Sequence, residues 1–189
     1  MRKSLIPVIA VMLAATACSS GTPDPVAVAI EQAAMKDAGD DYTFRINELA
    51  KLDSTTFRTE IERRKEVFRL KYQAEEKLCN RYLSEKKPKN AEIHRQAMEN
   101  ARHDIEIMDD IGRELESILD DVAYYDYVFS GYSQTADGRV NYNNVYVTIT
   151  PDNEVLTMTS NQKDLHKGTG KVIPGYVTII SSESGHEAE

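Results

Sequence analysis

Several common features are missing or scarce in this chain of 189 residues, and each shortage argues against a class of function. The chain contains no tryptophan, which counts against a platform for stacking sugars. Its 31 acidic residues outnumber its 23 basic ones, and the net charge of −8 argues against binding nucleic acid or an anionic lipid surface through charge. Only two cysteines are present, so a single intramolecular disulfide is the most that the chain could form.

The motifs of several enzyme classes are also missing. No Gly-x-Ser-x-Gly elbow for a nucleophilic serine occurs, and residues 168–170 lack the spacing and the following helix of a phosphate-binding loop. The acidic doublets 109–110 and 120–121 lack calcium-loop spacing. His166 in a predicted loop and His186 near the C-terminus suggest no acid–base pair. The sequence therefore predicts a protein that is not an enzyme and uses no metal or cofactor.

The N-terminus is the most informative segment that is present. Arg2 and Lys3 precede an apolar stretch from about Leu5 to Ala14, and small residues then lead to Cys18. Basic, apolar and small residues in this order are typical of a secretory signal peptide. The stretch is shorter than the roughly 20 apolar residues of a membrane-spanning helix. With a cysteine in place of an ordinary cleavage site, the segment resembles the signal peptide and lipobox of bacterial lipoproteins.

This resemblance implies a defined processing of the N-terminus. In such lipoproteins the cysteine thiol receives a diacylglyceryl group, the chain is cut before the cysteine, and the new amino group is acylated. Residues 1–17 are then a signal peptide, and residues 18–25 form a short lipidated tether. Loss of Arg2 and Lys3 changes the net charge from −8 to −10. Two or more acyl chains hold a protein stably on its membrane.

The resemblance also predicts a location. Ser19 occupies the position at which an inner-membrane retention signal has aspartate, and residues 19–25 contain no acidic run that resembles a surface-export signal. We therefore expect a lipid anchor in the outer membrane, with the protein facing the periplasm. A conventional signal peptide cleaved near Ala17 and a single membrane anchor are the alternatives.

The mature chain is predicted to begin with a helix and a candidate strand. Residues 26–38 are rich in alanine and valine and predict a short helix, with Asp24 as its N-cap and Pro25 at its first position. Residues 39–41 predict a turn. The alternation in Tyr42–Asn47 is typical of a strand, although the segment could also continue the helix after a break.

Two long helices are predicted next. Apolar residues recur at helical spacing from Thr56 to Lys86 and again from about Ala91 to Val122. Pro88 separates the two helices, and the short connection forces them to run antiparallel. The charges between Phe57 and Asp120 are interleaved and balanced, which predicts a solvated helical surface. Cys79 follows the apolar stripe and, with Cys18 lipidated, is predicted to be a buried free thiol.

The C-terminal third of the chain has the composition of a sheet. Four segments are rich in tyrosine, valine, isoleucine and threonine: Tyr124–Ser133, Val140–Thr150, Glu154–Ser160 and Lys171–Ile180. Asp137-Gly138 is a strong hairpin signal, and Pro151 begins a second turn. Short connections between successive strands predict an antiparallel meander.

These elements predict one α+β domain over residues 26–180. The helical hairpin (about 56–122) packs on the four-stranded antiparallel β-meander (about 124–180), because each has an apolar face that the other can cover. Tyr42–Asn47 is a candidate extra strand at the edge. A hairpin that projects beyond the sheet as a free coiled coil is the alternative. Residues 181–189 are predicted to be a disordered tail.

Tyrosines are the one pattern of the mature domain with functional interest, since seven of the ten lie in the predicted sheet region. Strand alternation places Tyr125 and Tyr127 on one face, and Tyr142 and Tyr146 together on a face of the next strand. We expect these rings to pack between helices and sheet with their hydroxyl groups at the rim. A concave surface of these four tyrosines that binds a sugar, a peptide or a small ligand is the alternative.

The anchor, the single small domain and the missing catalytic motifs favour a non-catalytic binding or assembly module of the bacterial cell envelope. Its partner would be an envelope protein or a polymer. The alternative is a small-ligand carrier or an enzyme with a tyrosine-lined pocket between helices and sheet. A deep cleft that contains several tyrosines and Asp126 would favour this alternative, and a filled interface would favour the binding module.

The substitution Cys18→Ser tests the anchor. We expect the protein to leave the membrane fraction, because the acyl chains supply the apolar surface that holds it on the bilayer. Membrane fractionation and immunoblotting measure the effect, with Cys79→Ser as the matched control that stays on the membrane. Unchanged membrane association of the Cys18→Ser protein would contradict the lipobox interpretation.

Overall fold

The fold is taken from a computed structural model of the chain, in which residues 23–39 and 41–177 are described. Its elements in chain order are α1 (Pro25–Met35), β1 (Thr43–Thr56), α2 (Phe57–Ser84), α3 (Pro88–Glu114), η1 (Glu116–Ile118), β2 (Val122–Thr135), β3 (Gly138–Ile149), β4 (Val155–Thr159), η2 (Gln162–Asp164) and η3 (Thr169–Val172). Within these residues no helix is both long enough and apolar enough to cross a lipid bilayer. Cys18, the predicted signal peptide 1–17 and the predicted tail 181–189 lie outside the described residues.

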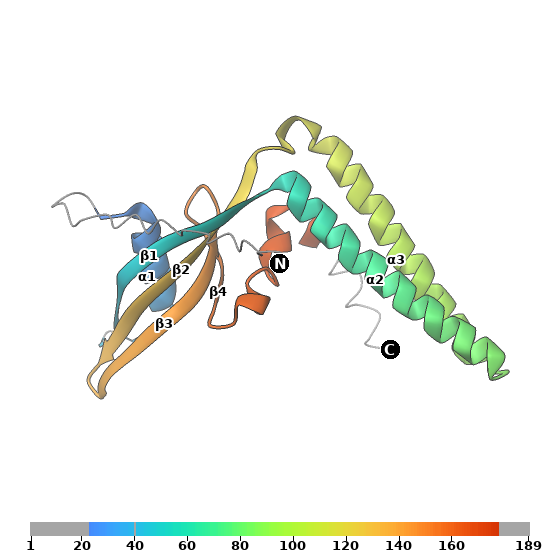
Figure 1. The fold of residues 1–189 in the computed structure, drawn as a ribbon, viewed down its shortest axis with the longest axis horizontal. Coiled ribbons are helices and arrows are strands. Elements are labelled where there is room, and N and C mark those ends of the chain that lie inside the picture. Colours follow the sequence, from blue (N-terminus) through green and yellow to red (C-terminus); the bar gives the residue numbers. More distant parts are fainter. Residues whose placement is uncertain (1–22, 40, 178–189) are drawn as a thin grey trace, which may run out of the picture.

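The four strands form one antiparallel sheet in the order β1-β2-β3-β4 (Figure 1). Together with the paired helices α2 and α3, this sheet confirms the predicted α+β class. The predicted turn residues lie at the strand connections. Gly138 begins β3 with a φ of 138°, and Asn153 has a φ of 65° between β3 and β4. Glycine and asparagine adopt positive φ more readily than other residues.

The fourth strand of the sheet is not the predicted one. A strand was expected over residues 171–180, but in the described part, 171–177, the chain forms the end of η3, a turn and then two helical residues. Pro174 has no amide hydrogen for a ladder, and Gly175 takes a φ of 82°, so extended pairing is interrupted. β1 supplies the fourth strand instead, which confirms the candidate strand at Tyr42–Asn47.

β1 is longer than predicted because bulges keep an irregular sequence paired with β2. The register of the two strands shifts between Ile46 and Glu48, and again between Lys51 and Asp53. Each of these shifts places an extra residue on β1. The two-residue alternation that predicted Tyr42–Asn47 therefore ends at the first bulge, while the pairing continues.

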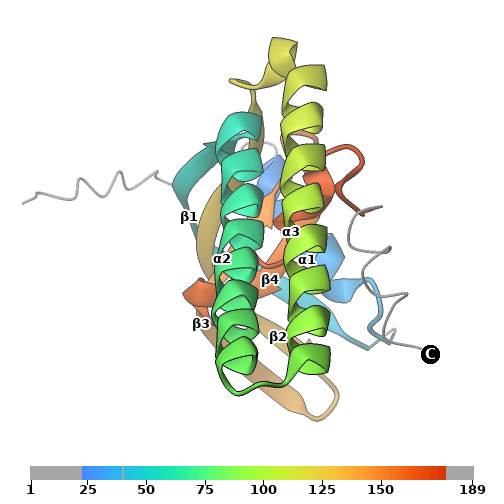
Figure 2. The ribbon, with the colours of Figure 1, turned by 90° about the vertical axis from the view of Figure 1, so that its right-hand side faces the viewer.

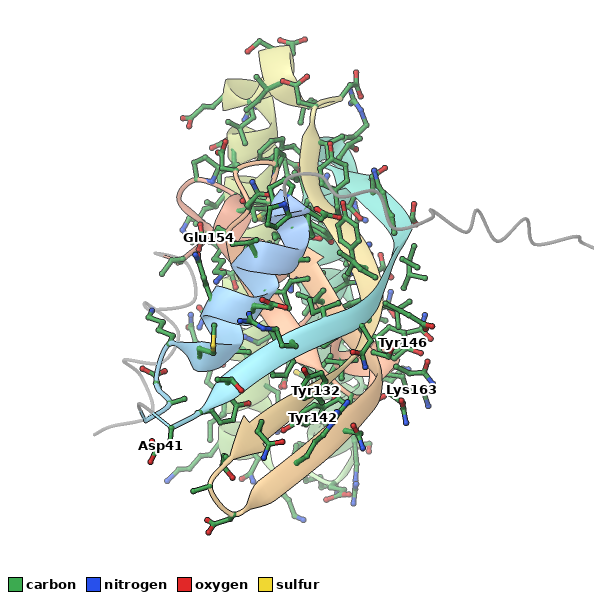
Figure 3. The ribbon with its side chains drawn as sticks, turned by 90° about the vertical axis from the view of Figure 1, so that its left-hand side faces the viewer. Asp41, Tyr132, Tyr142, Tyr146, Glu154 and Lys163 are labelled. Carbon is green, nitrogen blue, oxygen red and sulfur yellow. The ribbon has the colours of Figure 1, made fainter. Side chains whose placement is uncertain are left out.

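α1 covers one face of the sheet (Figure 3). The predicted cap is confirmed, since the Val26 amide donates to Asp24 Oδ1 at 2.9 Å and Pro25 occupies the first helical position. The core between this helix and the sheet has four fully buried members: Ile30, Phe44, Phe129 and Val147. This interface is filled with apolar side chains.

α2 and α3 form the predicted antiparallel hairpin. In the sequence the hairpin lies between β1 and β2, which are neighbouring strands of the sheet. α2 ends at Ser84, close to the predicted Lys86. α3 begins at Pro88, slightly before the predicted start, and it ends at Glu114 instead of reaching Val122. Asp120, whose acidic charge near a helix end suggested a partner, accepts a hydrogen bond from Arg58 Nε at 2.9 Å. The start of α2 is thereby tied to the chain that follows α3.

The hairpin does not lie across the sheet, as was expected, but extends away from one end of it (Figures 1 and 2). The reason is covalent: β1 ends at Thr56 and α2 begins at Phe57, so no loop allows the helix to fold back. The 28 residues of α2 span about 42 Å. The alternative of a projecting hairpin therefore describes the arrangement better.

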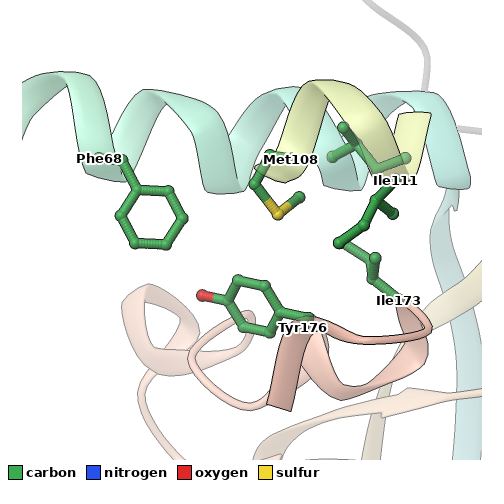
Figure 4. Close-up of a cluster of buried hydrophobic side chains, with 6 residues drawn as sticks. Phe68, Met108, Ile111, Ile173 and Tyr176 are labelled. Carbon is green, nitrogen blue, oxygen red and sulfur yellow. The ribbon is translucent and has the colours of Figure 1, made fainter. Parts of the chain in front are cut away.

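The base of the hairpin packs on the segment that follows β4, residues 161–177, here called the C-terminal segment (Figure 4). The buried cluster at this contact has six members: Ile61, Phe68, Met108, Ile111, Ile173 and Tyr176. The apolar residues that predicted a fourth strand thus pack between the base of the hairpin and the sheet.

Phe129→Ala tests the core beneath α1. We expect a loss of about 3–5 kcal/mol in the free energy of unfolding, because the substitution leaves a cavity among fully buried side chains. Val140→Ala is the control, since Val140 is 55% exposed and its truncation should change stability by less than about 0.5 kcal/mol. Denaturant unfolding followed by circular dichroism measures both, and equal small losses would contradict the assignment of this core.

Candidate functional site

The four tyrosines considered as a ligand-binding surface do not come together. Tyr127 packs in the core beneath α1, where burial raises the pKa of its hydroxyl. The Tyr125 ring lies edge-on to it, with ring centroids 6.5 Å apart, and Lys51 Nζ lies 3.8 Å from the Tyr125 centroid. These two rings are accounted for by contacts within the chain.

Tyr142 and Tyr146 lie on opposite faces of β3, so the prediction that they share a face is wrong. Next to Asn144, whose φ is 53°, β3 holds one residue more than β2. An extra residue reverses the alternation of side chains beyond it. Tyr142 therefore packs beneath α1 against Phe44, whereas Tyr146 pairs with Val128 on the other face.

A pocket of about 510 Å³ lies at the base of the hairpin, between the start of β2 and the turn that joins β3 to β4. Its polar lining includes Asp121, Glu154 and Lys171, and the Lys171 Nζ lies 3.7 Å from the Glu154 carboxylate. The pocket is lined by neither Asp126 nor any of the four tyrosines. It is not the tyrosine-lined cleft that a carrier or enzyme was expected to have.

A buried polar group joins the hairpin, the sheet and the C-terminal segment. Glu60, in the first turn of α2, is fully buried. Its Oε2 accepts hydrogen bonds from the Tyr124 hydroxyl at 2.7 Å and from Arg63 at 2.5 Å. Its Oε1 accepts from Arg64 Nε at 2.7 Å and from the Thr169 hydroxyl at 2.8 Å. We call these five residues the Glu60 cluster.

The cluster also fixes the path of the C-terminal segment. Arg64 donates from one guanidinium nitrogen to the His166 carbonyl and to Thr169 Oγ1, both at 2.7 Å. A side chain at Gly170 would meet the Tyr176 ring at 2.2 Å, so only glycine lets these parts of the segment pack closely. The chain from His166 to Tyr176 is thereby held against α2.

Tyr124 is the member of the cluster that belongs to the sheet. Burial, and then the negative charge of Glu60, raise the pKa of its hydroxyl to about 12. The hydroxyl therefore stays protonated at physiological pH and remains a donor to Glu60. A buried carboxylate is stable only where donors replace its hydration, and Tyr124 contributes one of the four.

At the edge of the Glu60 cluster, the structure brings together an acid–base pair that the sequence did not suggest. His166 Nε2 lies 2.8 Å from Asp126 Oδ2, and the Tyr124 ring lies 5.7 Å from the imidazole. The Asp126 side chain is almost fully buried, whereas one third of His166 is exposed. A carboxylate that orients an accessible imidazole is an arrangement that can transfer protons.

Sequence reasoning also missed Glu60 and Arg64, which were counted among the solvated charges of the helices. Their four-residue spacing is the same as that of exposed pairs such as Arg81 and Glu85. No feature of the sequence separates the two cases. Burial of Glu60 depends on Tyr124 and Thr169, which are distant in the chain.

The outer part of the hairpin is held by contacts between its own helices. Glu75 and His94 pair across it at 2.6 Å, and the Tyr82 ring stacks on His94 with centroids 5.2 Å apart. Cys79 is buried in the same region and is free, as predicted. His103 on α3 is exposed and lies away from His94.

Within residues 23–39 and 41–177, no three His, Cys, Asp or Glu side chains are grouped so that they could hold a metal ion.

Comparison with protein-family models, with curated proteins and with solved structures finds no match to this chain. Its function therefore has to be inferred from its own geometry.

Glu60→Gln tests the central role of the Glu60 cluster. We expect the free energy of unfolding to fall by about 3–5 kcal/mol, because the buried Arg64 loses the charge that compensates it. Glu66→Gln is the control, since Glu66 pairs with Arg69 at the surface and its loss should cost less than about 1 kcal/mol. Chemical denaturation measures both, and a small effect at Glu60 would show that the cluster does not hold the domain together.

Proposed function

We propose that this protein is a lipid-anchored component of the bacterial cell envelope that acts as a non-catalytic binding or assembly module. Its anchor is the acylated Cys18, in the outer membrane and facing the periplasm. Its working element is the helical hairpin, which presents a surface to an envelope protein or polymer.

The observation that carries this proposal is the length of hairpin that extends beyond the sheet and the C-terminal segment, which we call the body of the protein. Contacts with the C-terminal segment reach Phe68 on α2 and Met108 on α3. The outer part, between these two residues, is packed helix against helix, and it keeps Leu70 and Ile93 exposed by 56% and 67%. A long projecting element with exposed apolar side chains is typical of an interaction surface.

The small number of residues between Cys18 and α1 supports the same function. α1 begins at Pro25, seven residues after Cys18, so the tether spans at most about 25 Å. The body of the protein would stay close to the bilayer, while a hairpin of about 42 Å reaches further. Such an arrangement suits a protein that positions a partner near a membrane.

A ligand carrier or an enzyme is the second candidate function, favoured by the Asp126–His166 pair. In this case the exposed imidazole of His166 would exchange protons with a bound substrate, and Asp126 would orient it. The filled core beneath α1 and the separated tyrosines favour the binding module over this candidate.

A shortened hairpin tests the proposed function. Deleting residues 73–79 and 94–100 together removes one facing heptad from each helix and keeps the base and the tip. Affinity capture from envelope extracts with the intact lipoprotein should enrich a partner, and the shortened protein should recover several-fold less of it. The control is the Glu66→Gln protein, which should capture normally.

Two outcomes would contradict the proposal. Equal capture by the shortened and intact proteins would remove the hairpin from binding. A hydrolytic or transferase activity that disappears in His166→Ala, with the fold retained, would show that the protein is catalytic.

A further inference from the structure

The loop that joins α2 to α3 is basic, although the chain as a whole is acidic. Residues 81–95 contain five Lys or Arg and two Glu, whereas the whole chain has a net charge of −8. The loop lies at one end of the long axis of the molecule, far from α1 (Figure 1). We call its three exposed lysines, Lys86, Lys87 and Lys89, the tip lysines. Positive charge is therefore concentrated at the end of the hairpin.

The charges at the tip are only partly compensated within the chain. Glu85 accepts a hydrogen bond from Arg81 Nε at 2.9 Å and pairs with Lys87 Nζ at 2.7 Å, so one carboxylate serves two cations. Among the residues that the structure describes, the other two tip lysines form no ion pair. Leu83, two residues before Glu85, is 56% exposed. The tip thus combines unpaired positive charge with an exposed apolar side chain.

The end of α2 has a lysine where the backbone favours glycine. The amide of Lys87 donates to the Tyr82 carbonyl at 2.9 Å, and this bond closes α2 with a Schellman motif. Lys86, inside the motif, has a φ of 55°, a conformation in which glycine is strongly preferred. Lysine at this position therefore makes the turn less stable than glycine would.

The start of α3 also has lysines where the helix favours other residues. Lys87 is the N-cap of α3 and makes no side-chain hydrogen bond there, whereas Ser, Thr, Asp or Asn would supply one. Lys89 lies in a first turn without acidic residues, although the positive end of the helix dipole favours them. The tip keeps its positive charge against these local preferences, which is expected where the charge binds a partner.

The acidic body of the protein does not cancel the charge of the tip. From Phe68, the last residue of α2 in the buried cluster at the base, to Ser84 the helix rises about 24 Å. The Debye length at physiological ionic strength is about 8 Å, so the charges of the body are screened at the tip. The net charge argues against binding of the whole chain to an anionic surface, but it does not apply to this end of the hairpin.

The shape of the tip selects the kind of anionic partner. Two packed helix ends cover about 20 Å by 10 Å, or about 200 Å², whereas a specific protein interface needs about 800 Å² from each partner. A bilayer needs no complementary shape. Its anionic headgroups attract lysines, and an apolar side chain can enter the boundary between headgroups and acyl chains. Leu83 beside the tip lysines fits this kind of surface.

We propose that the tip of the hairpin binds an anionic lipid surface through the tip lysines and Leu83. Each lysine near such a surface strengthens binding about fivefold, so the three together contribute about 100-fold. The contact is a second point of attachment besides the acylated Cys18, and it is intramolecular when both lie on one bilayer. It goes beyond the proposed function, because the sides of the hairpin stay available to an envelope partner.

A fluorescent probe at the tip tests the contact. Asn90→Cys in a Cys79→Ser background places one free thiol directly after Lys89, and an environment-sensitive fluorophore on it reports loss of water. The labelled intact lipoprotein is reconstituted in phosphatidylcholine vesicles, with or without about 30% phosphatidylglycerol. We expect a blue shift of the emission only with phosphatidylglycerol, and its disappearance in about 0.5 M salt, because salt screens the attraction.

Charge-neutral variants identify the residues of the contact. The blue shift should disappear when the three tip lysines are replaced together: Lys86→Gln, Lys87→Gln and Lys89→Gln. The matched control makes the same change of net charge at three exposed lysines of the C-terminal segment and should keep the blue shift: Lys163→Gln, Lys167→Gln and Lys171→Gln. Far-UV circular dichroism should show equal helix content in both.

Lys86→Gly separates lipid binding from folding. The melting temperature should rise by about 2–4 °C, because glycine suits the positive φ of this position. The affinity of the tip for the phosphatidylglycerol vesicles should fall about fivefold, because one of the three charges is lost. A lysine with only a structural role would not give these opposite effects.

The vesicle experiment also distinguishes two sources of the lipid surface. Clustering of vesicles together with the blue shift would mean that the tip binds an opposing bilayer, and a blue shift without clustering that it binds the bilayer of the anchor. Unchanged emission on phosphatidylglycerol vesicles would overturn the inference, as would equal loss of the blue shift in the tip variant and the control. Partner capture that persists in the tip variant would leave the proposed function standing.

Discussion

The buried carboxylate of Glu60 is the interaction on which the arrangement of this protein depends. A charge without contact with water is stable only among compensating donors, and here the donors come from three parts of the chain. Arg64 belongs to the same helix, Tyr124 to the sheet and Thr169 to the C-terminal segment. If any of these parts moved, the carboxylate would lose a donor. The cluster therefore fixes the direction in which the hairpin leaves the sheet.

This direction divides the molecule into parts with different roles. The sheet and α1 enclose a filled apolar core, and the C-terminal segment packs against the base of the hairpin. The hairpin beyond Phe68 contributes little to either core and keeps the side chains of Leu70 and Ile93 exposed. The residues that stabilise the fold and the residues of the proposed interaction surface thus lie in different regions of the chain.

The elements that sequence reasoning predicted correctly are those whose signals are local. Asp24 and Pro25 mark the start of α1, helical periodicity marks the hairpin, and Gly138 marks a turn, because each reports the backbone geometry of its own neighbourhood. The errors arise where distant contacts decide. Residues 171–177 have the composition of a strand. Pro174 and the contacts of Tyr176 with α2 instead make them an irregular segment that packs on the base of the hairpin. One extra residue near Asn144 separated two tyrosines that simple alternation had placed together.

By itself, then, the sequence determined the α+β class, the helical hairpin and the buried Cys79, whereas the lipid-anchoring signal at Cys18 stays a prediction. Only the tertiary structure decided that the hairpin projects from the sheet, that Glu60 and Arg64 are buried, and that Asp126 meets His166. The physical reason is the range of the interactions concerned. Periodicity, capping and turn preference act within a few residues, whereas burial of a charge depends on donors that lie up to 109 residues away, as Thr169 does from Glu60.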